Sequence, residues 1–552
     1  MNKNLTVNTL VKISLPLALL FLAGCTNLFP RPDLAEVVYI NGVIYTVDQK
    51  QPWIDSVAIK EGKFIAAGAR NEIDKFIGNK TDIVDLQGQF VLPGMHDAHT
   101  HIELVANQRK VWCYIPTDAS PDIFISTLKN CNLNLGNDDW LLASAYSPGM
   151  FPNAQIDRSY LDRYFPDRPI YIVEHSWHHG MGNSKALEIA GINDNTPDPV
   201  EGKIIRDKDG RATGELVEKA AWLVKQHIPA TPSKEFRKAI KWIIAMHNRY
   251  GITSVQDAET TAHALKEFKA LDESEGLSLR IAAHIIWDHP GFAGASNEVM
   301  EDLIENRADY SSQRIDPNFV KIIVDGSPME PHSNHADLDP KTDEIPADKL
   351  LISPDRLKAA LIRFDKMGIK VKMHCVGTAA ARAGLDAIEA ARRTNGDSGI
   401  YHEIAHSVWY SEKDLPRVAQ LNAVAEMSPA IWHHGWPGME DAFEFQELDN
   451  NGTLITAGTD WVILPNPNLI PALEGMLTRE RHSIDLESGI EILTINGAKS
   501  IGKEESFGSI EVGKSADMVV LDRNLFQIPV DQISEAQVVM TIFEGKPVFT
   551  AR

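Results

Sequence analysis

Residues 90–103 read Phe90-Val91-Leu92-Pro93-Gly94-Met95-His96-Asp97-Ala98-His99-Thr100-His101-Ile102-Glu103. The apolar run Phe90–Leu92 predicts a strand, and Pro93-Gly94 interrupts its ladder and turns the chain. Asp97, His99 and His101 follow. Side chains two positions apart point to the same side of an extended backbone, so His99 and His101 can present two imidazoles to one point. Such a pair at a strand end is suited to a divalent metal, although a His-x-His pair also arises by chance in loops.

The composition is that of a soluble globular protein with more than one structural unit. Of its 552 residues, 43% are hydrophobic and 24% are charged, as in ordinary soluble proteins. A chain of this length usually forms more than one hydrophobic core. Its formal net charge of -22 argues against nucleic acid as a partner, because nucleic-acid binding requires a basic face.

Residues 1–25 predict an export signal. Lys3 and Lys12 precede the apolar run Ile13–Ala23. This run is shorter than the roughly 20 residues of a membrane span. The run closes on Leu22-Ala23-Gly24-Cys25. This pattern resembles a bacterial lipoprotein signal, in which Cys25 carries the lipid, and Thr26 after it then implies the outer membrane or periplasm. The alternative is an ordinary cleaved signal with a chance cysteine.

Export makes disulfides permissible for the remaining cysteines. Cys113 and Cys131 lie in one segment at a feasible loop length, so we expect a bond between them. Cys375 directly follows a candidate metal ligand, His374, and we interpret it as a small buried apolar residue.

Short strands near both termini predict one small β-sandwich domain, built from residues 34–89 and 500–552. In the first segment Asn41-Gly42 and Glu61-Gly62 have the composition of hairpin turns. The second segment shows the same strand–turn–strand pattern, with a turn before Lys546-Pro547. A two-layer packing of these strands is the natural way to bury their apolar faces.

Between the termini, apolar strands alternate with helical segments, which predicts a parallel sheet with helical crossovers. The expected strands number eight, as in a (β/α)8 TIM barrel of residues 90–499. They are Phe90–Leu92, Ile252–Gln256, Leu279–Ile286, Phe319–Val324, Ile369–Met373, Tyr401–Ala405, Ala423–Met427 and Thr453–Ala457. The crossover over 104–251 is too long for one helix, so we expect it to form a cap over the carboxyl ends of the strands. An open doubly wound sheet is the alternative topology.

Four further residues stand at or near the ends of these strands. Lys321 lies within an apolar strand, where a bare ammonium would be unfavourable unless it is paired or chemically altered. His374, His406 and Asp460 each end a later strand. Each has an ordinary explanation as a hydrogen-bonded core histidine, a loop cap or a lysine reaching solvent. Together they cluster at one end of the proposed barrel, where active groups of such barrels lie.

Several motifs resemble those of the amidohydrolase superfamily, and within it the amidohydrolase 3 group with its YtcJ-like proteins and N-substituted formamide deformylases. The likeness covers nearly the whole chain after residue 25. It is carried by residues 92–101, Thr213-Gly214-Glu215-Leu216, residues 251–258, Lys321 with Asp325-Gly326-Ser327, His374, His406, Gly458-Thr459-Asp460-Trp461 and residues 508–517.

The resemblance implies a metal centre with one or two divalent ions, zinc being the first choice. It implies that His99 and His101 hold one metal, that Lys321 is a carboxylated lysine bridging to a second, and that His374 and His406 complete that second site. Asp460 would bind metal and carry the proton of the attacking water. His178 resembles a substrate-facing histidine of the cap, although a surface histidine in a turn explains it equally well.

The function implied is hydrolysis of non-peptide carbon–nitrogen bonds in a small-molecule substrate: an amide, N-acyl or N-formyl bond. A deaminase or cyclic-amide hydrolase on the same metals is one alternative. A catalytically silent surface-binding lipoprotein is another, against which Lys321 and Asp460 argue, because binding needs neither a bridging ligand nor a proton carrier. A homodimer is possible, but the sequence does not determine the oligomeric state.

Three departures from the family pattern leave the substrate open. The fifth strand is followed by His374-Cys375-Val376-Gly377-Thr378, which lacks the usual carboxylate. The seventh is followed by a displaced His433-His434 pair. Residues 331–339, with His332 and His335, match no pattern of the family.

Overall fold

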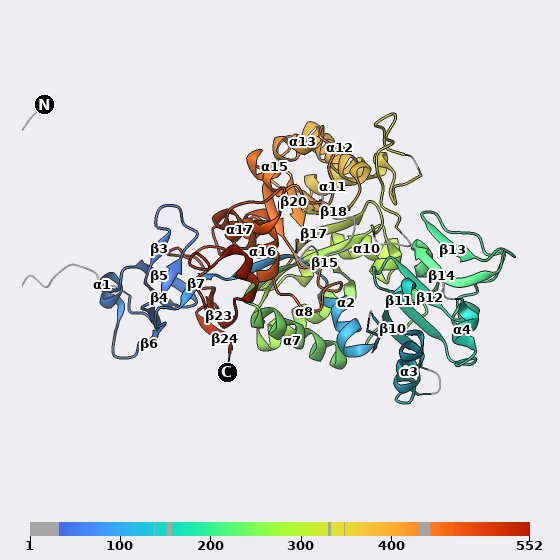
Figure 1. Cartoon of the computed structure of the whole chain (residues 1–552), viewed down its shortest axis with the longest axis horizontal. Coiled ribbons are helices and arrows are strands. Elements are labelled where there is room, and N and C mark those ends of the chain that lie inside the picture. Colours follow the sequence, from blue (N-terminus) through green and yellow to red (C-terminus); the bar gives the residue numbers. More distant parts are fainter. Residues whose placement is uncertain are drawn as a thin grey trace, which may run out of the picture.

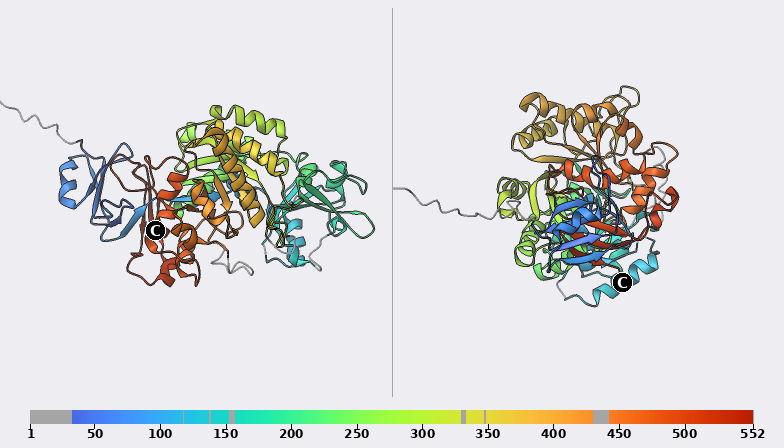
Figure 2. Two further views of the ribbon diagram at one scale, coloured as in Figure 1. Left: turned by 90° about the horizontal axis from the view of Figure 1, so that it is seen from above. Right: turned by 90° about the vertical axis from the view of Figure 1, so that its left-hand side faces the viewer.

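The computed structural model describes residues 33–551 except 117, 137–138, 152–156, 329–332, 347 and 430–441. Three parts follow one another along the long axis of the molecule: a β-domain at one end, a barrel in the middle and a mostly β cap at the other end (Figures 1 and 2). The β-domain combines the first and the last segments of the chain, so both described termini lie on that side of the barrel.

The central part is a closed parallel barrel, which confirms the predicted fold class. Its strands occur in the order β21-β20-β19-β18-β17-β16-β15-β8, and a parallel bridge between Thr100 and Trp461 joins the last strand's loop to the first strand. The bounds are β8 Met95–Thr100, β15 Ile252–Thr260, β16 Arg280–Trp287, β17 Ile315–Ile323, β18 Lys370–Cys375, β19 Glu403–His406, β20 Val424–Met427 and β21 Leu454–Ala457. The open-sheet alternative is therefore wrong.

The prediction for the first barrel strand is wrong. Phe90–Pro93 forms β7, which pairs with β2 (Val43–Tyr45) and β22 (Met518–Leu521) in the β-domain. The first barrel strand is β8, five residues further on, and it pairs with β15. The more apolar run, β7, belongs to the smaller domain. The barrel strand β8 is more polar, since it contains His96, Asp97 and His99, and its sequence therefore looks less like a buried strand.

Helices surround the barrel and bury apolar stripes against it. In α11 (Pro354–Lys366), Ser353 caps the first turn through a hydrogen bond from the Arg356 amide, and Pro354 occupies the first helical position. Leu357, Leu361 and Phe364 are buried on its inner face. The other long helices are α7 Ser233–Arg249, α8 Ala262–Glu275, α10 Asn297–Glu305, α12 Thr378–Asn395, α16 Ile470–Thr478 and α17 Leu486–Leu493.

The β-domain consists of two sheets around an apolar core. One sheet has the order β5-β4-β1-β6 and the other β24-β23-β22-β7-β2-β3. Their remaining bounds are β1 Val37–Ile40, β3 Trp53–Ile54, β4 Ser56–Lys60, β5 Lys63–Gly68, β6 Asp82–Asp85, β23 Val538–Phe543 and β24 Lys546–Thr550. Glu61-Gly62 is a hairpin turn as predicted. Asn41-Gly42 is not, because β1 and β2 lie in different sheets.

The cap lies between β8 and β15 and contains a six-stranded sheet, β13-β14-β12-β11-β10-β9. Its strands are β9 Cys113–Tyr114, β10 Leu141–Tyr146, β11 Ile170–Glu174, β12 His179–Gly182, β13 Gly202–Arg206 and β14 Ala212–Glu218. The predicted disulfide is confirmed: Cys113 in β9 bonds Cys131 in α3 (Pro121–Asn132). Cys375 is buried, as expected.

In the described part of the chain, no helix is both long and apolar enough to cross a membrane. The signal segment with Cys25 lies outside the described residues, as do His332, His433 and His434.

Candidate metal centre

A close contact between two strand ends shapes the centre. Gly458, just after β21, passes so near β8 that a Cβ on it would lie 2.4 Å from the Cβ and the backbone N of His99. The Asp97 carboxylate accepts hydrogen bonds from the Thr459 amide at 2.9 Å and its hydroxyl at 2.6 Å. The Asp460 amide in turn donates to the His99 carbonyl at 2.7 Å. These contacts fix Asp460 against His99.

Gly458→Ala should disturb this contact, because the added methyl collides with the backbone of β8. We expect a loss of about 1–3 kcal/mol of stability and, since His99 and Asp460 shift together, a loss of roughly a hundredfold in kcat/KM. Thermal unfolding and steady-state kinetics measure the two effects. Gly149→Ala is the matched control, since its Cβ would meet nothing nearer than 3.8 Å; equal behaviour of the two variants would contradict the prediction.

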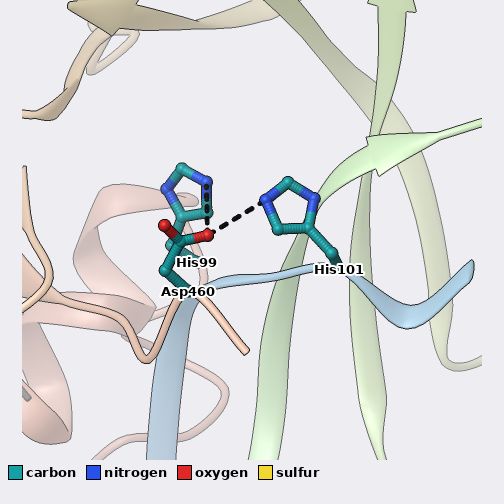
Figure 3. Close-up of side chains that lie close together, drawn as sticks. All are labelled: His99, His101 and Asp460. Atoms are coloured by element: carbon teal, nitrogen blue, oxygen red, sulfur yellow. Dashed lines mark ion pairs between the residues drawn. The ribbon is translucent and has the colours of Figure 1, made fainter. Parts of the chain in front are cut away.

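Three candidate ligands lie close together at the mouth of the barrel (Figure 3). Asp460 Oδ1 lies 3.2 Å from His101 Nε2 and 4.0 Å from His99 Nε2. His99 is the penultimate residue of β8, and His101 lies just beyond that strand, directly before α2 (Ile102–Ala106). The three ligand atoms lie within 4.8 Å of one another, and all three residues are buried or nearly so. This is the spacing that a shared cation requires.

The other predicted ligands adjoin this group. Lys321 Nζ, from β17, lies 3.4 Å from His99 Nε2. The His406 ring centroid is 4.5 Å from that of His99 and 4.3 Å from that of His374. The structure therefore brings all six predicted metal-site residues to one place.

The backbone is strained at two of these positions. His406 has φ 70° and Asp460 has φ 49°, in the left-handed region that residues other than glycine rarely adopt. Such strain persists only where the surroundings hold it, and it concentrates at functional sites. Here the loops after β19 and β21 are held so that both side chains reach the centre.

The imidazoles of the centre are held neutral. Burial, followed by the charge of Lys321, lowers the pKa of His99 far below its ordinary value. Burial likewise lowers the pKa values of His374 and His406, and lowers that of His101 less strongly. A neutral imidazole offers a lone pair, which is the form that binds a metal. The donor set of nitrogen and carboxylate oxygen atoms thus fits a divalent transition metal.

Charged residues inside the barrel, which the sequence analysis missed, support His99 from behind. Glu426 in β20 accepts a hydrogen bond from His99 Nδ1 at 2.5 Å, which leaves Nε2 facing Asp460 and Lys321. Lys372 donates to the Ala98 carbonyl at 2.6 Å and lies 3.3 Å from Glu403 and 3.9 Å from Glu426. A carboxylate behind a ligating histidine fixes its tautomer and ring orientation.

His178, the predicted substrate-facing residue, reaches the centre from the cap. Its ring centroid lies 5.1 Å from that of His374. Its Nδ1 donates to Glu218 Oε1 at 2.8 Å, and the same oxygen accepts a hydrogen bond from Asn334 at 2.8 Å. Burial opposes a charge on His178, but the charge of Glu218 outweighs it and raises the pKa of the imidazole. Glu218 has φ 50°, so it is a third residue near the centre with a strained backbone, and the sequence does not reveal it.

Comparison with known proteins agrees with this geometry. The profile of the amidohydrolase family matches residues 82–549. An N-substituted formamide deformylase of Arthrobacter pascens is 24% identical over 93% of this chain and 98% of its own length. YtcJ of Bacillus subtilis (strain 168) is 24% identical over 93% of this chain and 99% of its own.

Among solved structures, an uncharacterised metal-dependent hydrolase from Pyrococcus horikoshii superposes with a TM-score of 0.69 at 20% identity. The match covers 90% of this chain and 99% of that one. The profile match runs from β6 through the barrel and the cap into β24, and it leaves out β1 to β5 of the β-domain. The chain therefore belongs to the amidohydrolase family, as a hydrolase that acts on carbon–nitrogen bonds.

Proposed function

We propose that this protein is a metal-dependent hydrolase of non-peptide amide, N-acyl or N-formyl bonds. The observation that carries the proposal is the convergence of His99, His101 and Asp460, with their ligand atoms within 4.8 Å, at the mouth of a closed barrel. The similarity to the N-substituted formamide deformylase of Arthrobacter pascens supports a substrate of this class.

In this proposal His99, His101 and Asp460 would hold one divalent ion, His374 and His406 would hold a second, and a carboxylated Lys321 would be shared by the two sites. Zinc is the first choice, and manganese, iron or cobalt suit similar ligands. A bound divalent ion supplies Lewis acidity, which acidifies water toward a pKa of about 7 and polarises a carbonyl.

The remaining steps belong to side chains of this protein. Asp460 Oδ1 accepts the proton of the attacking water and returns it to the leaving nitrogen, which lets one group serve as base and then as acid. His178 donates a hydrogen bond from Nε2 to the substrate's carbonyl oxygen, where negative charge develops. Glu218 acts as a positioning residue, because it holds Nδ1 of that imidazole at 2.8 Å.

Two measurements test the proposal. Metal analysis of protein purified without chelator should find one or two equivalents of a divalent metal. A screen of N-acyl and N-formyl amines with the metal-loaded protein should then release carboxylate and amine. Release of ammonia instead would favour the deaminase alternative, and the absence of any hydrolysis by the loaded protein would favour a surface-binding protein.

Glu218→Gln should lower kcat while leaving the metal in place, because it removes the charge that orients His178. We expect a loss of about 10- to 100-fold, with KM changed less than kcat. The pKa of His178, raised by Glu218, should fall, so activity that needs its protonated form should be lost at a lower pH. Rate–pH profiles and metal content provide the measurement.

The matched control is Glu188→Gln, an exposed cap residue, which should behave as the unaltered protein. Glu218→Asp keeps the charge and should recover part of the rate. An unchanged pH profile in Glu218→Gln would show that Glu218 does not act through His178.

We also propose that Cys25 is lipidated and anchors the mature protein in the cell envelope. The support is the sequence pattern of residues 1–25. Membrane fractionation tests it: the unaltered protein should sediment with membranes, and Cys25→Ser should appear in the soluble fraction. If both proteins distribute equally between the membrane and soluble fractions, the proposed lipid anchor is wrong. A homodimer remains a prediction.

A further inference from the structure

A cavity of about 310 Å³ lies between the barrel and the cap, beside the metal centre. From the barrel side, Glu259 near the end of β15 and His263 at the start of α8 contribute to its wall; from the cap side, Trp112 and Trp177 do. Cavities of this size accommodate a small organic group. None of the proposed catalytic or metal-binding residues lies in its lining.

Glu259 is a buried carboxyl group in the wall of this cavity. It is 3% exposed, and no hydrogen bond to it is found from any residue that the structure describes. Its Oε2 lies 3.8 Å from His101 Nδ1, too far for a hydrogen bond. Because Glu259 lines the cavity, a bound ligand could supply the hydrogen-bonding partner that no described residue provides. The buried indole Nε1 of Trp177, a residue that is 4% exposed, likewise has no partner among the described residues.

The chemistry of the wall favours a positively charged group. Trp112 and Trp177 stack with centroids 5.9 Å apart and an interplanar angle of 26°, and Phe292 adds a third aromatic ring. Aromatic faces attract ammonium groups. The lining also holds two carboxyl groups, Glu103 and Glu259, and one lysine, Lys225.

These three polar groups are not equally available to a ligand. Lys225 donates to the Gly291 carbonyl at 2.7 Å, and Glu103 accepts a hydrogen bond from the Thr261 hydroxyl. Glu259 interacts electrostatically with Lys225, but alone of the three it has no hydrogen bond to a described residue, so it is the group that an incoming cation would contact.

The His101 ring separates Glu259 from the metal centre, since Nε2 faces Asp460 at 3.2 Å while Nδ1 faces Glu259 at 3.8 Å. A group bound at Glu259 therefore lies about one imidazole width from the reacting atoms. Resting on the proposed function, we propose that the cavity binds an ammonium group on the amine portion of the amide substrate. A short apolar spacer would join this ammonium to the scissile nitrogen.

Binding of simple amines tests the site without hydrolysis. The probes are 2-phenylethylamine, 2-phenylethanol and phenylacetate, which share one ring and differ in charge. Calorimetry and quenching of tryptophan fluorescence report the binding. We expect the ammonium to bind at least about tenfold more tightly than the alcohol, with phenylacetate weakest. Equal binding of the ammonium and the alcohol would overturn the proposal.

Glu259→Gln should abolish the preference for the ammonium, because it removes the charge and keeps the shape. Glu259→Asp should keep much of it, and Glu505→Gln, an exposed control, should keep all of it. A preference that survives in Glu259→Gln would overturn the proposal.

A role of Glu259 in orienting His101 is tested by repeating the binding measurements on chelator-treated, unaltered protein. The ammonium preference should persist without metal. Its disappearance would show that Glu259 acts through the metal centre and would overturn the cavity proposal.

A matched pair of amides tests the link to catalysis. The two share an acyl group and carry an amino or a methyl group at the same position of the amine portion. The amino compound should have a kcat/KM at least about tenfold higher. Equal hydrolysis of both overturns the cavity's role and leaves the proposed function standing. Selective amine binding without hydrolysis of any amide overturns the proposed function and leaves the cavity as a binding site.

Discussion

Asp460→Asn should reduce hydrolysis by about 10³-fold or more while the protein stays folded and keeps most of its metal. Asparagine has the same shape as aspartate, so the backbone contact from Asp460 to the His99 carbonyl at 2.7 Å is preserved. What disappears is the group that accepts and returns a proton, and general acid–base catalysis contributes roughly 10²–10⁴-fold to a rate. Asp460 also lies 3.2 Å from His101 Nε2, so part of the loss reflects weaker coordination.

The two contributions can be separated by measurement. Single-turnover rates at saturating metal report the proton transfer, and metal titration reports the coordination. Asp209→Asn in an exposed turn of the cap is the matched control and should leave both unchanged. Circular dichroism should first show that Asp460→Asn is folded like the unaltered protein. Full activity in a folded Asp460→Asn would then contradict the role of Asp460 as proton carrier.

The sequence predicts seven of the eight barrel strands, because each contains a short run in which apolar residues predominate or alternate with polar ones. Observed β17, for example, covers Ile315–Ile323 where Phe319–Val324 is expected. The first strand is misplaced for a physical reason. β8 reads Met-His-Asp-Ala-His-Thr, a polar pattern that only its burial inside the barrel explains, whereas the apolar β7 nearby satisfies every local criterion for a strand.

The candidate metal ligands were identified from sequence, but their supporting residues were not. Glu426 lies in an apolar strand just as Lys321 does, so the argument that a charge there needs a partner would have singled it out. Glu218 and Glu259 offer no comparable signal. Their importance comes from contacts with residues that are distant in the sequence. Glu218 contacts His178, 40 positions away, and Glu259 lies near His101, 158 positions away. The strained backbone at Glu218 is likewise visible only in the structure.

Lys321→Met should lose metal and activity together, by about 10³-fold or more in kcat/KM. Lys321 is 2% exposed, and its Nζ faces His99 Nε2 at 3.4 Å with no ion pair to any described carboxylate. Burial, then the charge of Lys372, lowers the pKa of Lys321 to about 8. The neutral amine is the form that reacts with carbon dioxide, so the lowered pKa favours the carbamate that the second metal site would use. Bicarbonate with added metal should not restore Lys321→Met.

The same substitution should have the opposite effect on the metal-free protein, and this separates a metal ligand from an ordinary structural lysine. Without metal, Lys321 is a buried cation, and replacing such a group with an apolar side chain is neutral or stabilising by about 1–4 kcal/mol. Because its folded pKa lies below the ordinary 10.5, the destabilisation is full below about pH 8 and is relieved as the pH rises toward 10.5.

Chelator-treated Lys321→Met should therefore unfold at the same or a higher temperature than the chelator-treated unaltered protein, with the larger difference at pH 7. With metal present the order should reverse, because only the unaltered protein gains the stabilisation of a bound ion. Lys234→Met, at an exposed helix start, should show neither effect. Retention of two metals by Lys321→Met would rule out a bridging lysine, since a methionine side chain cannot form a carbamate.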